Sequence, residues 1–193
     1  MTRNPPPPSR PDRPSQSEGR TWRRIFDDLA VGRHAALEEL YDEAAPQLYG
    51  LALWRTGSED DAADVVQDVF VKVAEQGPKL TKIRNPKGWL LTVTHRVAVD
   101  IARRRIRRAA EPLDEYPFLS AIPGDSDTML DAAHASVLLA GMPPNHRDVI
   151  YLRHFADCTF AEIGTIVGIP TFTAASRYRK GIKDLRNLME EQP

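Results

Sequence analysis

Basic and hydroxyl side chains gather at helical spacing near the carboxyl end of the chain. Thr173, Ser176, Arg177 and Lys180 recur at intervals that place them on one side of a helix. An arginine can pair bidentately with guanine, and hydroxyl groups can bond bases or phosphates. The set therefore indicates a helix that binds the major groove of DNA. The alternative is an ordinary helical hairpin with a solvated basic face.

The residues around this set carry the signals of a helix-turn-helix. Thr159 and Glu162 have the spacing of a capping box, which predicts the start of a first helix. Gly168 suits a left-handed residue at the end of that helix, and Pro170 prevents its continuation. Thr171 is expected to cap a second, longer helix, so that the two helices and the tight turn form a helix-turn-helix. The apolar positions of the second helix are Ala175, Tyr178, Ile182, Leu185 and Met189.

A second basic region lies near the middle of the chain. Residues 77–88 are expected to form a loop, and Trp89 is expected to open a helix that runs into an arginine-rich segment at 103–108. The exposed side of that helix is predicted to carry Thr92, His95, Arg96, Asp100 and Arg103. A basic loop, an aromatic residue and an arginine run suit phosphates and a stacked, unpaired base. The alternative is an amphipathic helix whose basic end complements the helix dipole.

A predicted helix before this region has one apolar and one acidic face. Ser58 is a suitable N-cap, and Pro46 is expected to kink or restart the helix that precedes it. The apolar stripe consists of Ala62, Val65, Val66, Val69, Phe70 and Val73. The opposite face carries Asp61, Asp64, Gln67, Asp68 and Lys72. Taken alone, such an acidic face is most simply explained as a solvated surface.

Composition is that of a soluble globular protein. The chain has 193 residues, 41% hydrophobic and 27% charged, with a net charge of −1, so it is not a polycation as a whole. The single cysteine, Cys158, excludes an internal disulfide and a multi-cysteine zinc site, and is expected to be a packed residue. Scattered histidines, no glycine-rich phosphate loop and no nucleophile elbow argue against an enzyme, a metal site or a cofactor. No apolar run or signal core is present, which predicts a cytoplasmic protein without membrane insertion.

The helical periodicity predicts an all-α chain of two small domains. Residues 1–20 are proline-rich and are expected to be a disordered tail. Residues 21–108 form the first helical domain, residues 109–126 a flexible acidic linker, and residues 127–193 the second domain with the helix-turn-helix. A further helix through Leu130 and Leu138 is expected in the second domain.

Several motifs, in order, resemble the sigma-70 family of bacterial RNA polymerase sigma factors, in its extracytoplasmic-function (ECF) group. Residues 64–70, Asp-Val-Val-Gln-Asp-Val-Phe, are similar to the family's Asp-Leu-Val-Gln-Glu-Ala-Phe signature in region 2. Residues 85–105 resemble its promoter-melting helix, which binds the −10 element. Met142-Pro-Pro is similar to the Leu-Pro-Pro start of region 4, and the helix-turn-helix completes that region. The resemblance runs from about Trp22 to Leu188.

This resemblance implies three sets of contacts. Docking on the clamp helices of the largest polymerase subunit would use Asp61, Asp64, Gln67, Asp68 and Lys72. Binding and melting of the −10 element would use Lys82, Arg84, Asn85, Lys87, Trp89, Thr92, His95, Arg96, Arg103 and Arg104. Binding of the −35 element would use Thr171, Thr173, Ala174, Ser176, Arg177, Arg179 and Lys180.

The resemblance also implies a function and further partners. The chain would bind core RNA polymerase, with region 4 on the flap of the second-largest subunit, and direct it to promoter DNA. An anti-sigma factor is a further expected partner. The alternative is a stand-alone helix-turn-helix regulator, which binds duplex DNA without polymerase and usually as a dimer. In the helix-turn-helix, Phe172 and Ala175 stand where the family pattern has glycine and lysine.

Overall fold

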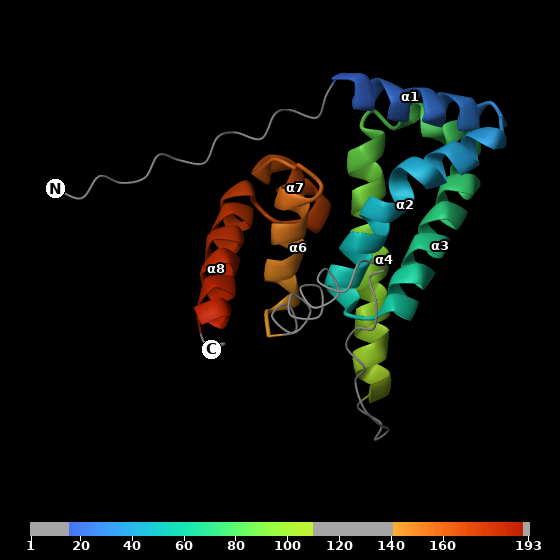
Figure 1. The fold of residues 1–193 in the computed structure, drawn as a ribbon. Coiled ribbons are helices and arrows are strands. Elements are labelled where there is room, and N and C mark those ends of the chain that lie inside the picture. Colours follow the sequence, from blue (N-terminus) through green and yellow to red (C-terminus); the bar gives the residue numbers. More distant parts are fainter. Residues whose placement is uncertain (1–15, 110–140, 191–193) are drawn as a thin grey trace, which may run out of the picture.

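The chain folds into helices throughout the part that the structure, a computed structural model, describes: residues 16–109 and 141–190. No strand occurs within these residues, and the all-α prediction is confirmed (Figure 1). The helices are α1 (Gln16–Ala30), α2 (Ala35–Thr56), α3 (Glu59–Gln76), α4 (Pro86–Ala109), α6 (Pro144–His154), α7 (Phe160–Val167) and α8 (Thr171–Glu190), with a 3-10 helix η1 (Gly77–Lys82). The predicted helix at 130–138 and residues 110–126 of the predicted linker lie outside the described residues. The predicted tail extends too far, because residues 16–20 belong to α1.

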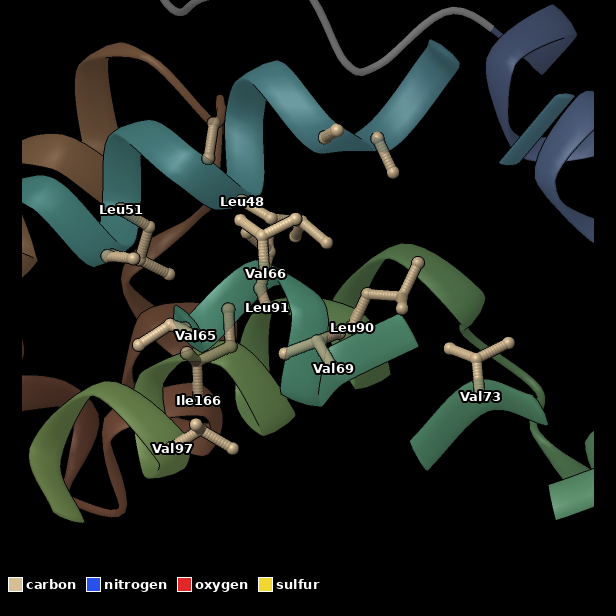
Figure 2. Close-up of a cluster of buried hydrophobic side chains, with 14 of the residues drawn as sticks. Leu48, Leu51, Val65, Val66, Val69, Val73, Leu90, Leu91, Val97 and Ile166 are labelled. Atoms are coloured by element: carbon tan, nitrogen blue, oxygen red, sulfur yellow. The ribbon is translucent and has the colours of Figure 1, made fainter. Parts of the chain in front are cut away.

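The first module is a bundle in which α2, α3 and α4 pack on one another and α1 crosses one end (Figure 1). Its centre is filled by leucine and valine side chains such as Leu48, Val69 and Leu90, each with no exposed surface (Figure 2). Burying one such side chain contributes about 1.5–3 kcal/mol relative to leaving it in water. The apolar stripe predicted for α3 is confirmed, since its alanine and valine positions are buried and Phe70 is partly buried.

Local signals set the ends of these helices largely as predicted. Ser58 caps α3 by accepting a hydrogen bond from the backbone N–H of Asp61 (3.4 Å). Gly57, with φ 69°, ends α2 in the left-handed conformation. The predicted restart at Pro46 is wrong, because α2 continues through it. Pro46 lies on the exposed side of the helix, where water can solvate the carbonyl that loses its partner.

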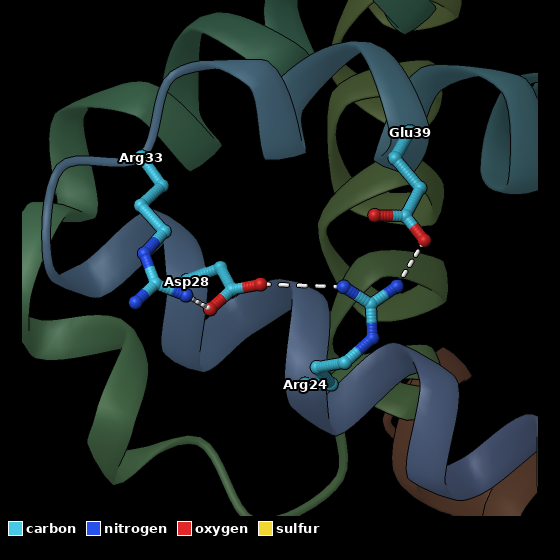
Figure 3. A network of polar contacts seen from close by, with 4 residues as sticks. All are labelled: Arg24, Asp28, Arg33 and Glu39. Carbon is cyan, nitrogen blue, oxygen red and sulfur yellow. Dashed lines mark hydrogen bonds and ion pairs between the residues drawn. The ribbon is translucent and has the colours of Figure 1, made fainter.

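An exposed network of charges joins α1 to the start of α2 (Figure 3). Asp28 accepts from Arg24 (3.2 Å) and from Arg33 (2.7 Å), and Arg24 also pairs with Glu39. Water screens such pairs, and each contributes little to stability. The network therefore orients α1 more than it stabilises the bundle.

The second module contains the predicted helix-turn-helix in α7 and α8. Gly168 has φ 75°, and the N–H of Ile169 donates to the carbonyl of Gly164 (2.8 Å). A Cβ atom at Gly164 would lie 2.7 Å from the carbonyl oxygen of Ile169, so only glycine fits this tight turn. The predicted cap at Thr171 is wrong, because Thr171 is already helical and the carbonyl of Pro170 accepts the first bond of α8.

The two modules pack against each other, α2 against α6 and α4 against α7 (Figure 1). One continuous cluster of buried side chains includes Leu48 and Val97 of the first module and Val149 and Ile166 of the second. The two modules therefore share one hydrophobic core in this arrangement. Among the described helices, none has the length and apolar character needed to cross a bilayer.

The capping box of α7 gives a test of local stability. The hydroxyl of Thr159 accepts from the N–H of Glu162 (3.3 Å), and the carboxylate of Glu162 accepts from the N–H of Thr159 (2.8 Å). Thr159→Ala is expected to lower the free energy of unfolding by about 0.5–2 kcal/mol. Urea denaturation measures the change. The control is Thr165→Ala, an exposed threonine of the same helix, expected to change stability by less than about 0.5 kcal/mol; equal losses in both variants would contradict the cap assignment.

Candidate functional site

The outer face of α8 carries most of the residues predicted to bind the −35 element. Thr171, Ser176, Arg179 and Lys180 are exposed, and Thr173 and Arg177 are partly exposed beside them. The prediction for Ala174 is wrong: its side chain is fully buried between α8 and the rest of the module. The predicted apolar positions Tyr178, Ile182 and Leu185 pack against the core, whereas Ala174 rather than Ala175 is the buried residue in the first turn of the helix.

The predicted −10 segment is more ordered than a loop. Residues 77–82 form η1, and α4 begins at Pro86 rather than at Trp89. Asn85 caps α4, because its side-chain oxygen accepts from the N–H of Gly88 (3.0 Å). Proline directly after a cap is favoured, since its missing N–H would be unpaired there in any case. The cap and the proline start explain why the helix begins one turn early.

Arg23 of α1 fixes this segment from outside. Its guanidinium donates to the carbonyls of Ile83 (2.6 Å) and Thr81 (2.9 Å). Trp89 packs edge-on against Phe26 of α1, with ring centroids 6.0 Å apart. No local sequence pattern indicates these contacts, because Arg23 is separated from its acceptors by about sixty residues. The result is a rigid presentation of Lys82, Arg84 and Asn85, all of which are exposed.

A cavity of about 660 Å³ lies between the two modules. One wall is the start of α4 and the loop before it, including Asn85, Trp89 and Arg96. The other wall is the turn between α6 and α7 with the first turns of α7, including Asp157 and Glu162. Several predicted −10 residues therefore face the second module in this arrangement.

Cys158, in that turn, is a packed residue as predicted. Its side chain is buried, and burial raises the pKa of its thiol to about 12. A thiol with so high a pKa is protonated at neutral pH and is a poor nucleophile.

A buried carboxylate joins the modules where α6 meets α2 and α4. Asp148 of α6 has no exposed surface, and its Oδ2 accepts from Arg55 of α2 (2.8 Å) and lies 3.1 Å from Nε2 of His95 in α4. The prediction that His95 lies on the exposed side of α4 is wrong, because it packs against α6 to reach this carboxylate. The sequence carried one weak signal: Asp148 stands one helical turn before the apolar Leu152, on the buried side of α6.

An aromatic seam continues the contact between α2 and α6. The hydroxyl of Tyr151 donates to the carbonyl of Gln47 (2.9 Å), and the side chain of Gln47 donates to the carbonyl of Phe155 (3.1 Å). Trp54 packs on both rings, with centroids 5.5 Å from Tyr151 and 5.3 Å from Phe155. Burial raises the pKa of Tyr151 to about 12, so its hydroxyl keeps its proton and its role as a donor.

The acidic face of α3 lies apart from this interface. Asp64, Gln67, Asp68 and Lys72 are exposed on it. Asp61 is instead paired with Arg105 of α4 (2.9 Å). Arg104 lines a polar hollow of about 350 Å³ together with Asp64 and Asp68, whereas Arg96 and Arg103 are exposed elsewhere on α4.

An apolar hollow of about 830 Å³ adjoins the acidic face between α2 and α3. Tyr41 and Val71 line it with about half of each side chain exposed, and Tyr41 packs against Phe70 with centroids 5.1 Å apart. An acidic row beside an apolar hollow is a surface that suits a partner helix with basic and apolar faces.

Comparisons with known proteins give consistent matches to both modules. Residues 40–108 match the family model for Sigma-70 region 2, and residues 138–187 match that for Sigma-70, region 4. The ECF RNA polymerase sigma factor SigL of Mycobacterium tuberculosis is 31% identical over 167 residues, covering 84% of this chain and 93% of that protein. SigE of Mycolicibacterium smegmatis is 28% identical over 188 residues, covering 90% of this chain and 69% of the relative.

Two solved structures have a similar fold. The sigma factor RpoE in complex with the anti-sigma factor NepR from Bartonella quintana superposes with a TM-score of 0.69 at 21% identity, covering 81% of this chain and 98% of that one. CnrH in complex with the cytosolic domain of CnrY gives a TM-score of 0.67 at 22% identity, covering 90% of this chain and 99% of that one.

Gly50 gives a test of the contact between the modules. A Cβ atom there would lie 2.2 Å from the hydroxyl of Tyr151, a distance at which one of the two must move. Gly50→Ala should raise helix propensity by about 0.5–1 kcal/mol. We nevertheless expect it to loosen the packing of α6 on α2, measured as a larger radius of gyration in small-angle X-ray scattering. Glu43→Ala, an exposed change on the same helix, is the control; scattering from Gly50→Ala that matched this control would contradict the close contact.

Proposed function

The chain belongs to the sigma-70 family of RNA polymerase sigma factors, in its ECF group, and on that premise we propose how its two modules share promoter recognition. It is a transcription initiation factor that binds core RNA polymerase and directs it to specific promoters. We propose that the chain acts in the cytoplasm and has no catalytic activity of its own. The observation that supports the assignment best is the pair of region matches, in family order, on two modules with distinct polar surfaces.

The outer face of α8 is proposed to bind the −35 element in the major groove. In a helix-turn-helix the first residues of the second helix approach base edges. Arg177 lies on the flank of this face and can pair bidentately with guanine. Lys180 and Arg179, further along, suit phosphate contacts that set affinity without sequence preference. Ala174 has no part in this surface because it is buried.

The segment from η1 to the start of α4 is proposed to bind the opened −10 element. Lys82, Arg84 and Lys87 supply positive charge for the single strand. Extruding a base costs a few kcal/mol, which contacts in a protein pocket must offset. The first-module wall of the cavity, which includes Asn85 and Trp89, becomes accessible to such a base once the second module moves away. Asn85 also caps α4, so its replacement would disturb the helix start as well as any base contact.

The acidic face of α3 is proposed to dock on the clamp helices of the largest polymerase subunit. Asp64, Gln67 and Asp68 are exposed and can accept hydrogen bonds from basic side chains of a coiled coil. The adjoining hollow lined by Tyr41 and Val71 supplies apolar area beside those charges. Asp61 contributes less directly, because Arg105 already neutralises it.

Promoter binding requires the modules to separate. In the packed arrangement the turn at residues 156–158 covers the cavity proposed for the −10 base, and His95 is enclosed against Asp148. An anti-sigma factor is a proposed partner that would favour the packed arrangement. The similar structure of RpoE, a sigma factor in complex with the anti-sigma factor NepR, supports that proposal. The flap of the second-largest polymerase subunit is proposed to hold region 4 in the separated form.

The stand-alone regulator is the weaker candidate. It needs no exposed acidic row, no basic segment for single strands and no second module. Relatives named RNA polymerase sigma factors, matched over most of this chain, favour the polymerase subunit. A gel shift without polymerase separates the two, because the regulator alone binds duplex sites as a dimer.

In vitro transcription from a randomised promoter library tests the assignment and one of its contacts. With core polymerase, the chain is expected to select a two-part promoter with a defined start. Arg177→Ala should weaken promoter binding by about 1–3 kcal/mol and relax selection at one −35 position. Arg186→Ala, an exposed arginine further along α8, is the matched control. Random starts with the wild-type chain would refute the function, and unchanged selection with Arg177→Ala would remove only that contact.

Core binding tests the role of α3. Replacing Asp64 and Asp68 together by alanine is expected to weaken the affinity for core polymerase by at least about tenfold, since each lost charge-assisted bond is worth about 1.5–3 kcal/mol. Far-ultraviolet circular dichroism should be unchanged, because both residues are exposed. The control pair Glu38→Ala and Glu43→Ala removes the same charge from α2. Equal affinities for both double variants would contradict the docking surface.

A further inference from the structure

Phe172 is the most exposed large apolar side chain among the described residues. It is the second residue of α8, and 75% of its surface is accessible. The rings of Phe160 and Tyr178, by contrast, pack against each other on the buried side of the same module, with centroids 5.4 Å apart. So large an exposed apolar ring is available for contact with a molecule outside the chain, and covering it would be favourable.

The position of Phe172 on α8 is fixed by the buried side of that helix. Ala174 has no exposed surface, and a Cβ atom at Gly181 would lie 2.9 Å from Cδ1 of Ile150 in α6. The side opposite these two residues carries Phe172, Ser176 and Lys180, spaced by four residues and all exposed. Phe172 therefore stands on the outer face, one turn ahead of the hydroxyl and basic groups proposed to meet DNA.

The tight turn before α8 holds Phe172 in place. Gly164 and Ile169 are in backbone contact, with a hydrogen bond of 2.8 Å, and Gly168 adopts the left-handed conformation. These contacts leave little freedom in the angle between α7 and α8. The side chain of Phe172 is thus presented at the amino-terminal end of the second helix, the end that enters deepest into the major groove in this motif.

The chemistry of the ring restricts what it can contact in that groove. A phenyl group neither donates nor accepts conventional hydrogen bonds, whereas the edges of adenine, guanine and cytosine present polar groups. Thymine alone presents an apolar group, the methyl at C5. We infer that Phe172 packs against the C5 methyl of one thymine in the upstream promoter element and makes the chain selective for that base. The inference rests on the proposed binding of that element by α8.

The family pattern places glycine at the position of Phe172, and glycine offers no side chain to a methyl group. Ala175, which stands where the family pattern has lysine, is only partly exposed and lies to the side of the outer face. Phe172 is therefore the departure that changes which bases are favoured.

Deoxyuridine substitution tests the contact, because uracil keeps the hydrogen-bonding edge of thymine and lacks only the methyl. The probe is the promoter selected from the library, bound by the complete complex of core polymerase and this chain. Each thymine of the upstream element is replaced singly, and affinity is measured by competition. We expect one position at which deoxyuridine weakens binding about three- to fivefold, the effect of removing one buried methyl-sized group.

The variant Phe172→Ala should bind the thymine and deoxyuridine promoters equally at that position, and Phe172→Leu should retain part of the difference. Val31→Ala removes another exposed apolar side chain, at the turn between α1 and α2, and should leave the difference intact. Circular dichroism checks that each variant is folded.

Three outcomes overturn the inference. The first is equal binding of all deoxyuridine promoters by the wild-type complex. The second is a difference that survives in Phe172→Ala. The third is a loss of core binding in Phe172→Ala with an unchanged deoxyuridine response, which would make Phe172 a protein contact. In each case transcription from a defined start by the wild-type chain leaves the proposed function standing, whereas random starts refute both.

Discussion

The buried carboxylate of Asp148 is the constraint on which the arrangement of the two modules depends. A charge without water must be paired, and breaking such a pair by removing one partner is strongly destabilising. Both partners of Asp148, Arg55 and His95, come from the other module. Asp148 therefore favours one relative placement of α6 on α2 and α4, beyond what the non-directional packing of apolar side chains requires.

The same chemistry limits the cost of separating the modules. Oδ1 of Asp148 has no hydrogen-bond partner within residues 16–109 and 141–190, so part of its desolvation cost is not offset. When the modules separate, water can solvate the carboxylate, the guanidinium and the imidazole. A purely apolar contact of the same area would lack this compensation. The interface thus combines specificity in the packed form with a limited cost of opening.

Packing affects the two surfaces proposed to bind DNA unequally. The outer face of α8 remains exposed, with Phe172 and Ser176 open to solvent. The start of α4 faces the turn before α7 across a cavity. The packed arrangement therefore leaves the face of α8 proposed for the −35 element accessible to DNA. It obstructs the surface at the start of α4 proposed for the opened strand. On the proposed function, regulation of this chain would act most directly on the separation of the modules.

Local signals made much of the fold predictable. The capping box at Thr159 and Glu162, the left-handed Gly168 and the apolar stripe of α3 depend on neighbours within one or two turns, and all are confirmed. The errors in the helix starts and buried faces concerned positions where two neighbouring residues could play the same structural role. Asn85 and Pro86 together start α4 before Trp89, and the buried register of α8 passes through Ala174.

Contacts between residues far apart in the sequence could not be predicted from local signals. Asp148 lies 93 residues from Arg55 and 53 from His95 in the sequence, and no periodicity connects them. The predicted exposure of His95 was wrong for this reason, since its burial depends on a helix of the other module. The surfaces proposed for polymerase and promoter remain predictions, because their partners are other molecules.

The distance between the modules, with and without polymerase, tests the central claim most directly. Spin labels on cysteines introduced at Asp60 in α3 and Arg186 in α8, both exposed, report it by pulsed electron resonance. Cys158 is buried with a pKa of about 12 and should resist labelling. We predict one narrow distance distribution for the free chain and a longer distance when core polymerase and promoter DNA are bound. An unchanged distribution on the transcribing complex would contradict the account.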